Sequence, residues 1–251
     1  MTEIAENRTL KADNRPRRDV APPRVRQFGA VNWRGLFTVA LQNRVGSVGA
    51  VSFTVFLAPG LIMMTILQNS FANTSSSMMT SKIQGNIVDV LMPPISPLEM
   101  LCGFLGGGVT RGFIVGISAT IAMMVLVDFP FHNPAIILFF ALTASMMMAL
   151  LGMIGGIWAE KFDHMAAITN FVVVPLSFLS GTFYSIDRLP EIWQSVAHLN
   201  PFFYAIDGFR YGFIGQGDAP FWLGAAVMLS VNLVLFLVVH RMLVTGYKLK
   251  S

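Results

Sequence analysis

The chain has 251 residues, of which 54% are hydrophobic and only 12% are charged. Charged residues make up about 25% of a typical soluble domain, so this chain has too few to cover a soluble globular surface, and we expect an integral membrane protein. The formal net charge is +4, and the single cysteine, Cys102, excludes an intramolecular disulfide.

The amino-terminal head is polar and basic. Residues 1–27 contain three prolines and are expected to be mostly disordered, and residues 1–44 hold nine Lys or Arg against four acidic residues. A basic head beside an apolar body is typical of a cytoplasmic segment next to a membrane. A nucleic-acid partner, the alternative for a basic tail, is not expected because no aromatic-rich soluble domain follows. Residues 28–43 are too short to span a bilayer but could lie on one as an interfacial amphipathic segment.

Five long apolar runs follow the head, and each has about the 20 residues that a spanning helix needs. They are residues 49–69, 106–127, 135–158, 165–186 and 219–240. Backbone groups in lipid must be paired internally, so we expect helices; the strands of a membrane barrel would alternate in polarity and be about half as long. The predicted fold class is an all-α integral membrane protein with five transmembrane helices.

The distribution of charge predicts how these runs are oriented. The basic tail after residue 240 is expected in the cytoplasm, and Lys82 and Lys161 then face the same side. Residues 187–218, with two basic and four acidic residues, face outward. Five spans place the two ends of the chain on opposite sides, although both ends are basic. Either a basic head crosses the membrane or one span is missing from this sequence.

Motifs for enzyme chemistry are missing from the sequence. It has no G-x-x-x-x-G-K-[ST] loop, so this chain is not expected to bind ATP itself. The four histidines are scattered and lack the spacing of a metal site, and no Ser-His-Asp constellation can be argued. We therefore expect no catalytic site, metal or cofactor in this chain.

Three glycines recur every four residues within the second run: Gly108, Gly112 and Gly116. This spacing places them on one helix face, where another helix can approach closely. We favour such a packing seam over the alternative, the general abundance of glycine in spanning helices.

Isolated polar residues also occur within the runs. Arg111 is expected to reach the cytoplasmic interface rather than a substrate, because a charge at the bilayer centre is costly. Asn170 and Asn232 can bond neighbouring helices or line a pathway, and helix–helix bonding is the preferred interpretation.

A short amphipathic stretch, SKIQGNIVDVLMPPISP (81–97), separates the first two runs. Serine or threonine residues within 75–81 can cap a helix start, and Pro93 and Pro94 can end the helix. Between them apolar and polar residues gather on opposite faces: Ile83, Ile87, Val90 and Leu91 against Lys82, Asn86 and Asp89. We expect a short amphipathic helix in a cytoplasmic loop, which either rests on the membrane surface or docks on a soluble partner.

Residues 187–218, DRLPEIWQSVAHLNPFFYAIDGFRYGFIGQGD, are neither a simple loop nor a clean span. Two prolines and several aromatic residues interrupt the stretch. We expect two short helices that lie at, or dip into, the outer leaflet, where non-helical backbone needs protein around it.

Three stretches resemble the permease subunits of ABC-2 type bacterial exporters: KIQGNIVDVLMPPISPLE (82–99), FLSGTFYSIDRLPEIW (178–193) and LNPFFYAIDGFRYGFIGQGD (199–218). The third is the most specific, because the Asn-Pro, the aromatic residues and the Asp-Gly-x-Arg recur in order. The resemblance covers residues 44–251, the expected transmembrane domain, and fits the drug, polysaccharide and lipo-oligosaccharide export group without singling out a substrate.

The resemblance implies a permease that pairs with a second copy among the lipids of the bacterial inner membrane. Two separate ABC ATPase subunits would lie below the pair and hold ATP and Mg²⁺. ATP binding would close the ATPases and rock the permeases, which would open an outward pathway between them.

The resemblance also implies roles for particular residues. Residues 75–94 would be the family's coupling helix, which sits in a cleft of the ATPase, and residues 160–164 would lie on the same side. The implied coupling residues are Lys82, Gln84, Gly85, Asp89, Glu160 and Lys161. Residues 187–218 would be the external re-entrant pair that closes the outer end, with Asn200, Pro201, Asp207 and Arg210.

One departure from the family concerns its first span. The family has six spans, with a basic interfacial helix running into the first. WRGLFTVALQN (33–43) is similar to the start of that interfacial region, and RVGSVGAVSFTVFLAPGLIMM (44–64) to the approach to the second span. The first span is therefore missing near residues 43–44. This agrees with the observation that both ends of the chain are basic although five spans place them on opposite sides, and we hypothesise an internal deletion.

The preferred function is the permease half of an ATP-driven exporter. An ATP-independent carrier or channel is the first alternative, but carriers usually show internal repeats and intramembrane charges for ion coupling. A non-transporting membrane scaffold is the second alternative, and the missing span makes it more plausible than usual.

Overall fold

Helices that are long enough to cross a membrane form most of the structure. The computed structural model describes residues 47–48, 51–85, 95–127, 130–186 and 190–248, which belong to the unit Trp33–Ser251. Five helical segments in this part of the chain are long and apolar enough to span: α2 (Phe53–Ile83), α4 (Pro97–Leu126), α5 (Pro134–Trp158), Phe162–Leu179 and α10 (Phe221–Thr245). This confirms the predicted all-α class and its five spans. The hypothesised deletion near residues 43–44 lies outside the described residues and stays a prediction.

The remaining elements are short. Phe162–Leu179 consists of α6 (Phe162–Ile168), the π-helix η1 (Thr169–Val173) and α7 (Val174–Leu179). Two further helices follow, α8 (Glu191–Leu199) and α9 (Pro201–Ile214), as predicted for this stretch. Before α2, the two-residue strands β1 (Ser47–Val48) and β2 (Val51–Ser52) pair antiparallel, with Ser47 opposite Ser52.

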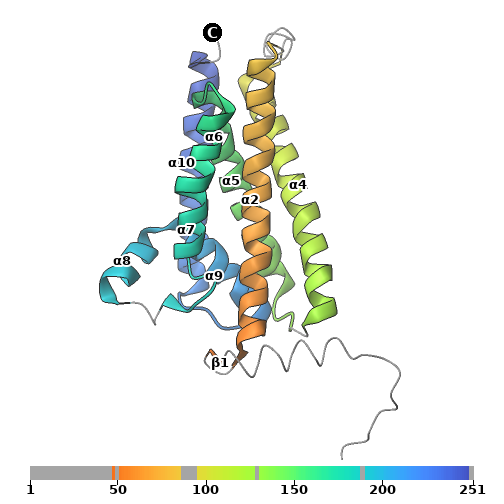
Figure 1. Ribbon diagram of the computed structural model, residues 1–251, viewed down its shortest axis with the longest axis vertical. Helices are drawn as coiled ribbons and strands as arrows, with labels where there is room; N and C mark the ends of the chain where they lie inside the picture. Colours follow the sequence, from red (N-terminus) through yellow and green to blue (C-terminus); the bar gives the residue numbers. More distant parts are fainter. Residues whose placement is uncertain (1–46, 49–50, 86–94, 128–129, 187–189, 249–251) are drawn as a thin grey trace, which may run out of the picture. The chain divides into compact units, whose positions relative to one another are not determined.

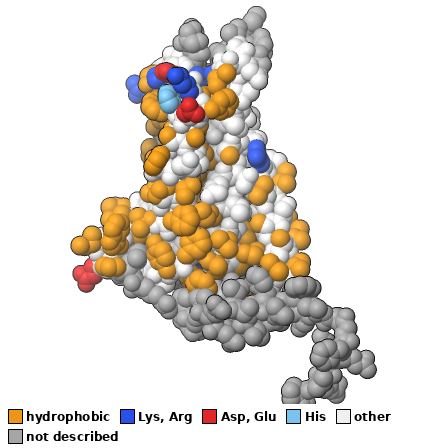
Figure 2. Space-filling model, in the orientation of Figure 1, with side chains coloured by type: hydrophobic (Ala, Val, Ile, Leu, Met, Phe, Trp, Pro, Cys, Tyr) orange, Lys and Arg blue, Asp and Glu red, His pale blue; other side chains and the backbone are white. Residues whose placement is uncertain are grey.

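The long helices run side by side and alternate in direction along the chain (Figure 1). As a result, one end of the bundle holds the ends of α2, α5 and α10 together with the start of α6. We call this the C-terminal end. The opposite end holds α9 and α8, and we call it the α9 end. On the face drawn in Figure 2, hydrophobic side chains cover much of the bundle, and charged side chains gather at the C-terminal end.

Capping residues explain where several helices begin. Before α4, Ser96 and Glu99 form a reciprocal capping box, with Pro97 in the first turn. Before α5, Asn133 accepts hydrogen bonds from the first backbone N–H groups, and Asn200 does the same before α9. The capping box extends α4 nine residues ahead of the predicted run 106–127.

The expected helix start within residues 75–81 is wrong, because α2 continues without interruption to Ile83. The hydroxyl groups of this stretch donate to carbonyl oxygens three or four residues earlier in the same helix. Ser75 donates to Ala72, Ser76 to Asn73 and Ser81 to Ser77. Such back-bonding satisfies the hydroxyls inside a helix, so they do not act as caps. The expected amphipathic helix itself falls mainly on residues 86–94, outside the described residues.

The core lies where α2 packs against α5, and it is rich in methionine. Six methionines on these two helices are completely buried: Met63, Met78, Met79, Met147, Met148 and Met153. An unbranched, flexible methionine side chain fills irregular gaps between helices. From α10, buried Asn232 donates to the carbonyls of Thr143 on α5 (2.9 Å) and of Met228, which confirms helix–helix bonding for this residue.

Glycines bring α4 close to this core. A Cβ added at Gly108 would lie 2.7 Å from Thr74 and 2.8 Å from Ala149, and one at Gly116 would lie 2.6 Å from Ile66. At Gly112 the added atom would meet the hydroxyls of Ser70 and Ser145, which are 2.7 Å apart. The three glycines therefore lie where α4 contacts α2 and α5.

Candidate functional site

Polar side chains gather in two clusters, one at each end of the bundle. The cluster at the C-terminal end, which we call the Lys82 cluster, consists of Lys82, Trp158, Glu160, His164 and Lys248. The cluster at the α9 end, which we call the Asp207 cluster, consists of Ser185, Asp207, Arg210 and Asp218. Each cluster joins segments that lie far apart in the sequence.

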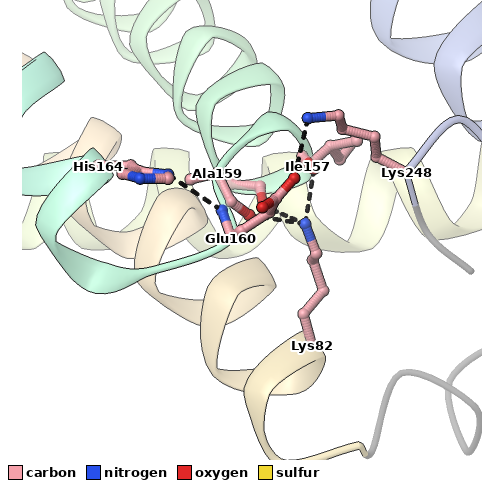
Figure 3. Close-up of polar contacts among 7 residues, drawn as sticks. Lys82, Ile157, Ala159, Glu160, His164 and Lys248 are labelled. Carbon is pink, nitrogen blue, oxygen red and sulfur yellow. Dashed lines mark hydrogen bonds and ion pairs between the residues drawn. The ribbon is translucent and has the colours of Figure 1, made fainter. Parts of the chain in front are cut away.

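Lys82 lies in the last turn of α2 and points to the end of α5 (Figure 3). Its ammonium group donates to the carbonyl oxygens of Ile157 and Ala159, each at 2.7 Å. The last carbonyls of a helix have no partner within the helix and carry partial negative charge. A half-buried cation from another helix therefore satisfies the end of α5, so α2 and α5 are tied together where both end.

The turn between α5 and α6 is tied to the chain's C-terminal tail as well. Lys248 forms an ion pair with Glu160, 3.2 Å between Nζ and Oε1, and lies 5.6 Å from the ring centre of Trp158. The backbone N–H of Glu160 donates to Nδ1 of His164 at 3.5 Å. Lys248 lowers the pKa of Glu160, so this contact contributes stability at neutral pH and loses it as the pH falls through the lowered pKa. The side chains of Lys248 and Glu160 are 36% and 67% exposed, so the contribution is small.

The structure places the implied coupling residues as follows. Lys82 and Glu160 come together in the Lys82 cluster, although they are far apart in sequence. Gln84 and Gly85 follow the end of α2 and are exposed, and Gly85 has a positive φ of 74°, which glycine adopts without strain. Lys161 is exposed just before α6. Asp89 lies outside the described residues.

At the α9 end, two carboxylates hold two connecting segments. Asp207 accepts hydrogen bonds from the backbone N–H groups of Asp218 (2.8 Å) and Ala219 (3.0 Å). Asp218 in turn accepts from the hydroxyl of Ser185 (2.9 Å) and the N–H of Ile186 (3.1 Å). The residues just before α10 are thereby fixed to α9, and the segment after α7 is fixed to the same residues.

Arg210 and Asn200 complete the attachment of α9. Arg210 is only 2% exposed; it donates to the carbonyl oxygen of Gly181 at 2.6 Å and lies 3.8 Å from the ring centre of Phe56 on α2. A guanidinium over an aromatic face is favourable, particularly when buried. Asn200 caps α9 and also donates to the carbonyl of Leu176 on α7 (2.9 Å), with Pro201 in the first turn of α9. All four residues singled out in this stretch therefore position α9.

Five members of these clusters were not among the expected site residues: Trp158, His164, Ser185, Asp218 and Lys248. Asp218 ends one of the stretches that carry the family resemblance, so its position in the sequence offered a signal. For Lys248 the only signal in the sequence was its basic charge, because the contact of the tail with Glu160 depends on how α10 packs.

Two cavities in the bundle are lined almost wholly by apolar side chains. One, of about 420 Å³, lies between α2, α4, α5 and α9, and the other, of about 590 Å³, lies between α5, the segment Phe162–Leu179 and helices α8 and α9. The polar side chains among their linings are Thr120 and Asn200, respectively. The polar groups of the two clusters thus hold helices together, and the cavities suit hydrocarbon better than a charged ligand.

Comparison with known proteins assigns the family. The sequence matches the family described as ABC-2 type transporter over residues 27–214. It is 35% identical over 216 residues to the inner membrane transport permease YadH of Escherichia coli K12, covering 86% of this chain and 84% of the relative. It is also 26% identical over 200 residues to nodulation protein J of Rhizobium leguminosarum bv. viciae, covering 77% and 75%. The chain therefore belongs to the ABC-2 type transporter family and is a membrane transport permease.

Proposed function

We propose that this chain is the permease subunit of an ATP-driven exporter, that it works as a homodimer in the inner membrane, and that separate ABC ATPase subunits drive it. Membership of the family implies an ABC ATPase partner in general terms. ATP and Mg²⁺ would be held on that partner, and this chain would supply the pathway.

One observation carries the proposal: the two segments expected to face the ATPase lie at the same end and are bonded to each other. The predicted coupling segment, residues 75–94, begins in the last turns of α2, and the α5–α6 turn contains Glu160 and Lys161. Lys82 joins the end of α2 to the end of α5. A displacement of the coupling segment would therefore move both segments together.

In this proposal the C-terminal end is cytoplasmic and the α9 end is external. Closure of the ATPases would push the end of α2 and the α5–α6 turn, and the long helices would carry the movement across the membrane. At the other end the Asp207 cluster ties α9 to α10 and to the segment after α7. These parts would move as one unit when the pathway opens.

The test is reconstitution with the ABC ATPase encoded nearest to this chain's gene. We expect the two proteins to copurify and the permease, in lipid nanodiscs, to change the ATPase rate. Asp89→Ala is expected to abolish this change, whereas Glu191→Ala, an exposed position on α8 at the opposite end, is expected to leave it intact. Failure to form a complex, or equal behaviour of the two variants, would contradict the coupling assignment.

A further inference from the structure

Three spans are poorly buried, and two of them have exposed faces suited to lipid. The least buried spans are α4, Phe162–Leu179 and α10. Exposed aliphatic side chains cover the outer faces of α4 and α10: Ile114, Ile117, Ile121, Leu229, Leu233 and Leu237. The exposed serines Ser118 and Ser230 each donate to a carbonyl of their own helix, which satisfies their hydroxyls. Contact with acyl chains therefore leaves no polar group of these residues unpaired.

The exposed face of Phe162–Leu179 carries a short amide near its middle. Asn170 lies near the middle of this span and is exposed beside Phe171, which is 80% exposed. Among the described residues Asn170 has no side-chain hydrogen bond, and an unpaired amide in hydrocarbon is unfavourable. Its side chain has a single methylene group and is too short to reach the membrane surface, unlike the long side chains of lysine and arginine.

The backbone at Asn170 is also unusual. Residues Thr169–Val173 form a π-helix, in which the N–H of Val174 donates to the carbonyl of Thr169, five residues earlier. Single π turns within α-helices are rare and are frequent at functional sites. An irregular turn and an unpaired amide thus coincide on one exposed face in the middle of a span.

We propose that Asn170 meets Asn170 of a second copy of this chain, so that Phe162–Leu179 forms the face through which two copies pair. The inference rests on the homodimer of the proposed function and names its contact face. In a two-fold interface a residue near the axis meets its own counterpart at the same depth. A carboxamide carries both donors and an acceptor, so two of them satisfy each other, and asparagine bonds across membrane helices in this way.

Single cysteines test which face pairs. In a Cys102→Ser chain reconstituted in nanodiscs, we would compare Asn170→Cys with Ile117→Cys on α4 and Leu233→Cys on α10, both exposed positions well inside their runs. A disulfide requires Cα atoms within about 7 Å, so it forms only close to the two-fold axis. After mild oxidation we expect Asn170→Cys to run mainly as a covalent dimer and the other two as monomers.

The mass of the unoxidised particles separates this inference from the proposed function. Particles that hold two copies but crosslink at position 117 or 233, or at none of the three, would overturn the contact face and leave the dimer standing. Particles that hold one copy would overturn both. A crosslink from position 170 to the chain's own residues 1–46, detected with a second cysteine there, would show that this segment covers Asn170 and would also overturn the inference.

Two further variants test the amide itself. Asn170→Leu is expected to raise the fraction of single-copy particles on dilution in detergent, and Asn170→Gln, which keeps the amide, is expected to restore pairing at least in part. Equal pairing of the two variants would overturn the hydrogen bond between the two carboxamides.

Discussion

At the scale of single residues, Lys82 and Arg210 each link parts of the chain that lie far apart in the sequence. Lys82 donates to two carbonyls at the end of α5, and Arg210 donates to Gly181 while it stacks on Phe56. Neither group is free to serve as a simple surface charge. The implied role of Lys82 in coupling is therefore better explained through the end of α5 than through a direct ion pair with a partner.

Removal of the Lys82 ammonium group tests this role. Lys82→Met keeps the length of the side chain but leaves the last carbonyls of α5 without a donor. Because hydrogen bonds to charged groups contribute about 1.5–3 kcal/mol, we expect the free energy of unfolding to fall by an amount in this range. Thermal unfolding in detergent, followed by tryptophan fluorescence, measures the loss.

Lys161→Met serves as the matched control, because Lys161 is an exposed lysine at the same end of the bundle. Surface charges of this kind typically change stability by less than about 0.5 kcal/mol. If the two variants unfold at the same temperature, Lys82 does not hold α2 to α5 in the membrane-embedded protein.

At the scale of elements, the approach of α4 depends on the absence of a side chain at Gly112. A Cβ there would overlap the hydroxyls of Ser70 and Ser145, which bond each other between α2 and α5. We expect Gly112→Ala to lower the free energy of unfolding by about 1–3 kcal/mol, the usual cost of overpacking. On the same helix, Gly106 is exposed with nothing within 4 Å of an added Cβ.

Gly106→Ala is therefore the control for this substitution, and it is expected to be neutral or to stabilise α4 by up to about 1 kcal/mol through helix propensity. Thermal unfolding of both variants gives the comparison. A loss of stability in Gly106→Ala as large as that in Gly112→Ala would show that glycine acts through backbone flexibility rather than through close packing.

The elements also show what the sequence could predict. Helix periodicity is local, so the spacing of Gly108, Gly112 and Gly116 sufficed to place them on one face. The helix start predicted within residues 75–81 is wrong because a serine hydroxyl can either cap a helix or donate to a carbonyl one turn earlier in the same helix. Which of the two occurs depends on packing around α2. The Asp207 cluster joins residues 181–186, 207–210 and 218–219. The two stretches 178–193 and 199–218 that carry the family resemblance include residues from all three segments, but only the tertiary fold brings these segments together.

At the scale of the whole molecule, length and hydropathy were enough to predict five spans, because a bilayer admits few backbone arrangements. The observed ends of the spans differ from the ends of the predicted apolar runs where local capping residues or turns begin or end a helix. The run 165–186 ends as a helix at Leu179, and the following turn includes Gly181 with a positive φ of 76°. Hydropathy depends only on how apolar the residues are, so it does not predict where such a turn ends the helix.

The number of crossings also predicts the side of each terminus. With five spans and a cytoplasmic C-terminus, α8 and the N-terminus both lie outside. In a Cys102→Ser chain we would label Thr2→Cys, Ser195→Cys and Ser251→Cys with a membrane-impermeant maleimide, first in spheroplasts and then after lysis. We expect Ser195→Cys and Thr2→Cys to react in spheroplasts and Ser251→Cys to react only after lysis.

The N-terminal position is the decisive one, because nine basic residues within 1–44 favour the cytoplasm. If Thr2→Cys is protected until lysis while Ser195→Cys is not, an additional crossing must lie between residue 2 and the start of α2, and the hypothesised deletion is wrong. If Ser251→Cys reacts in spheroplasts, the assignment of the C-terminal end to the cytoplasm fails, and with it the proposed approach of the ATPase to Lys82 and the α5–α6 turn.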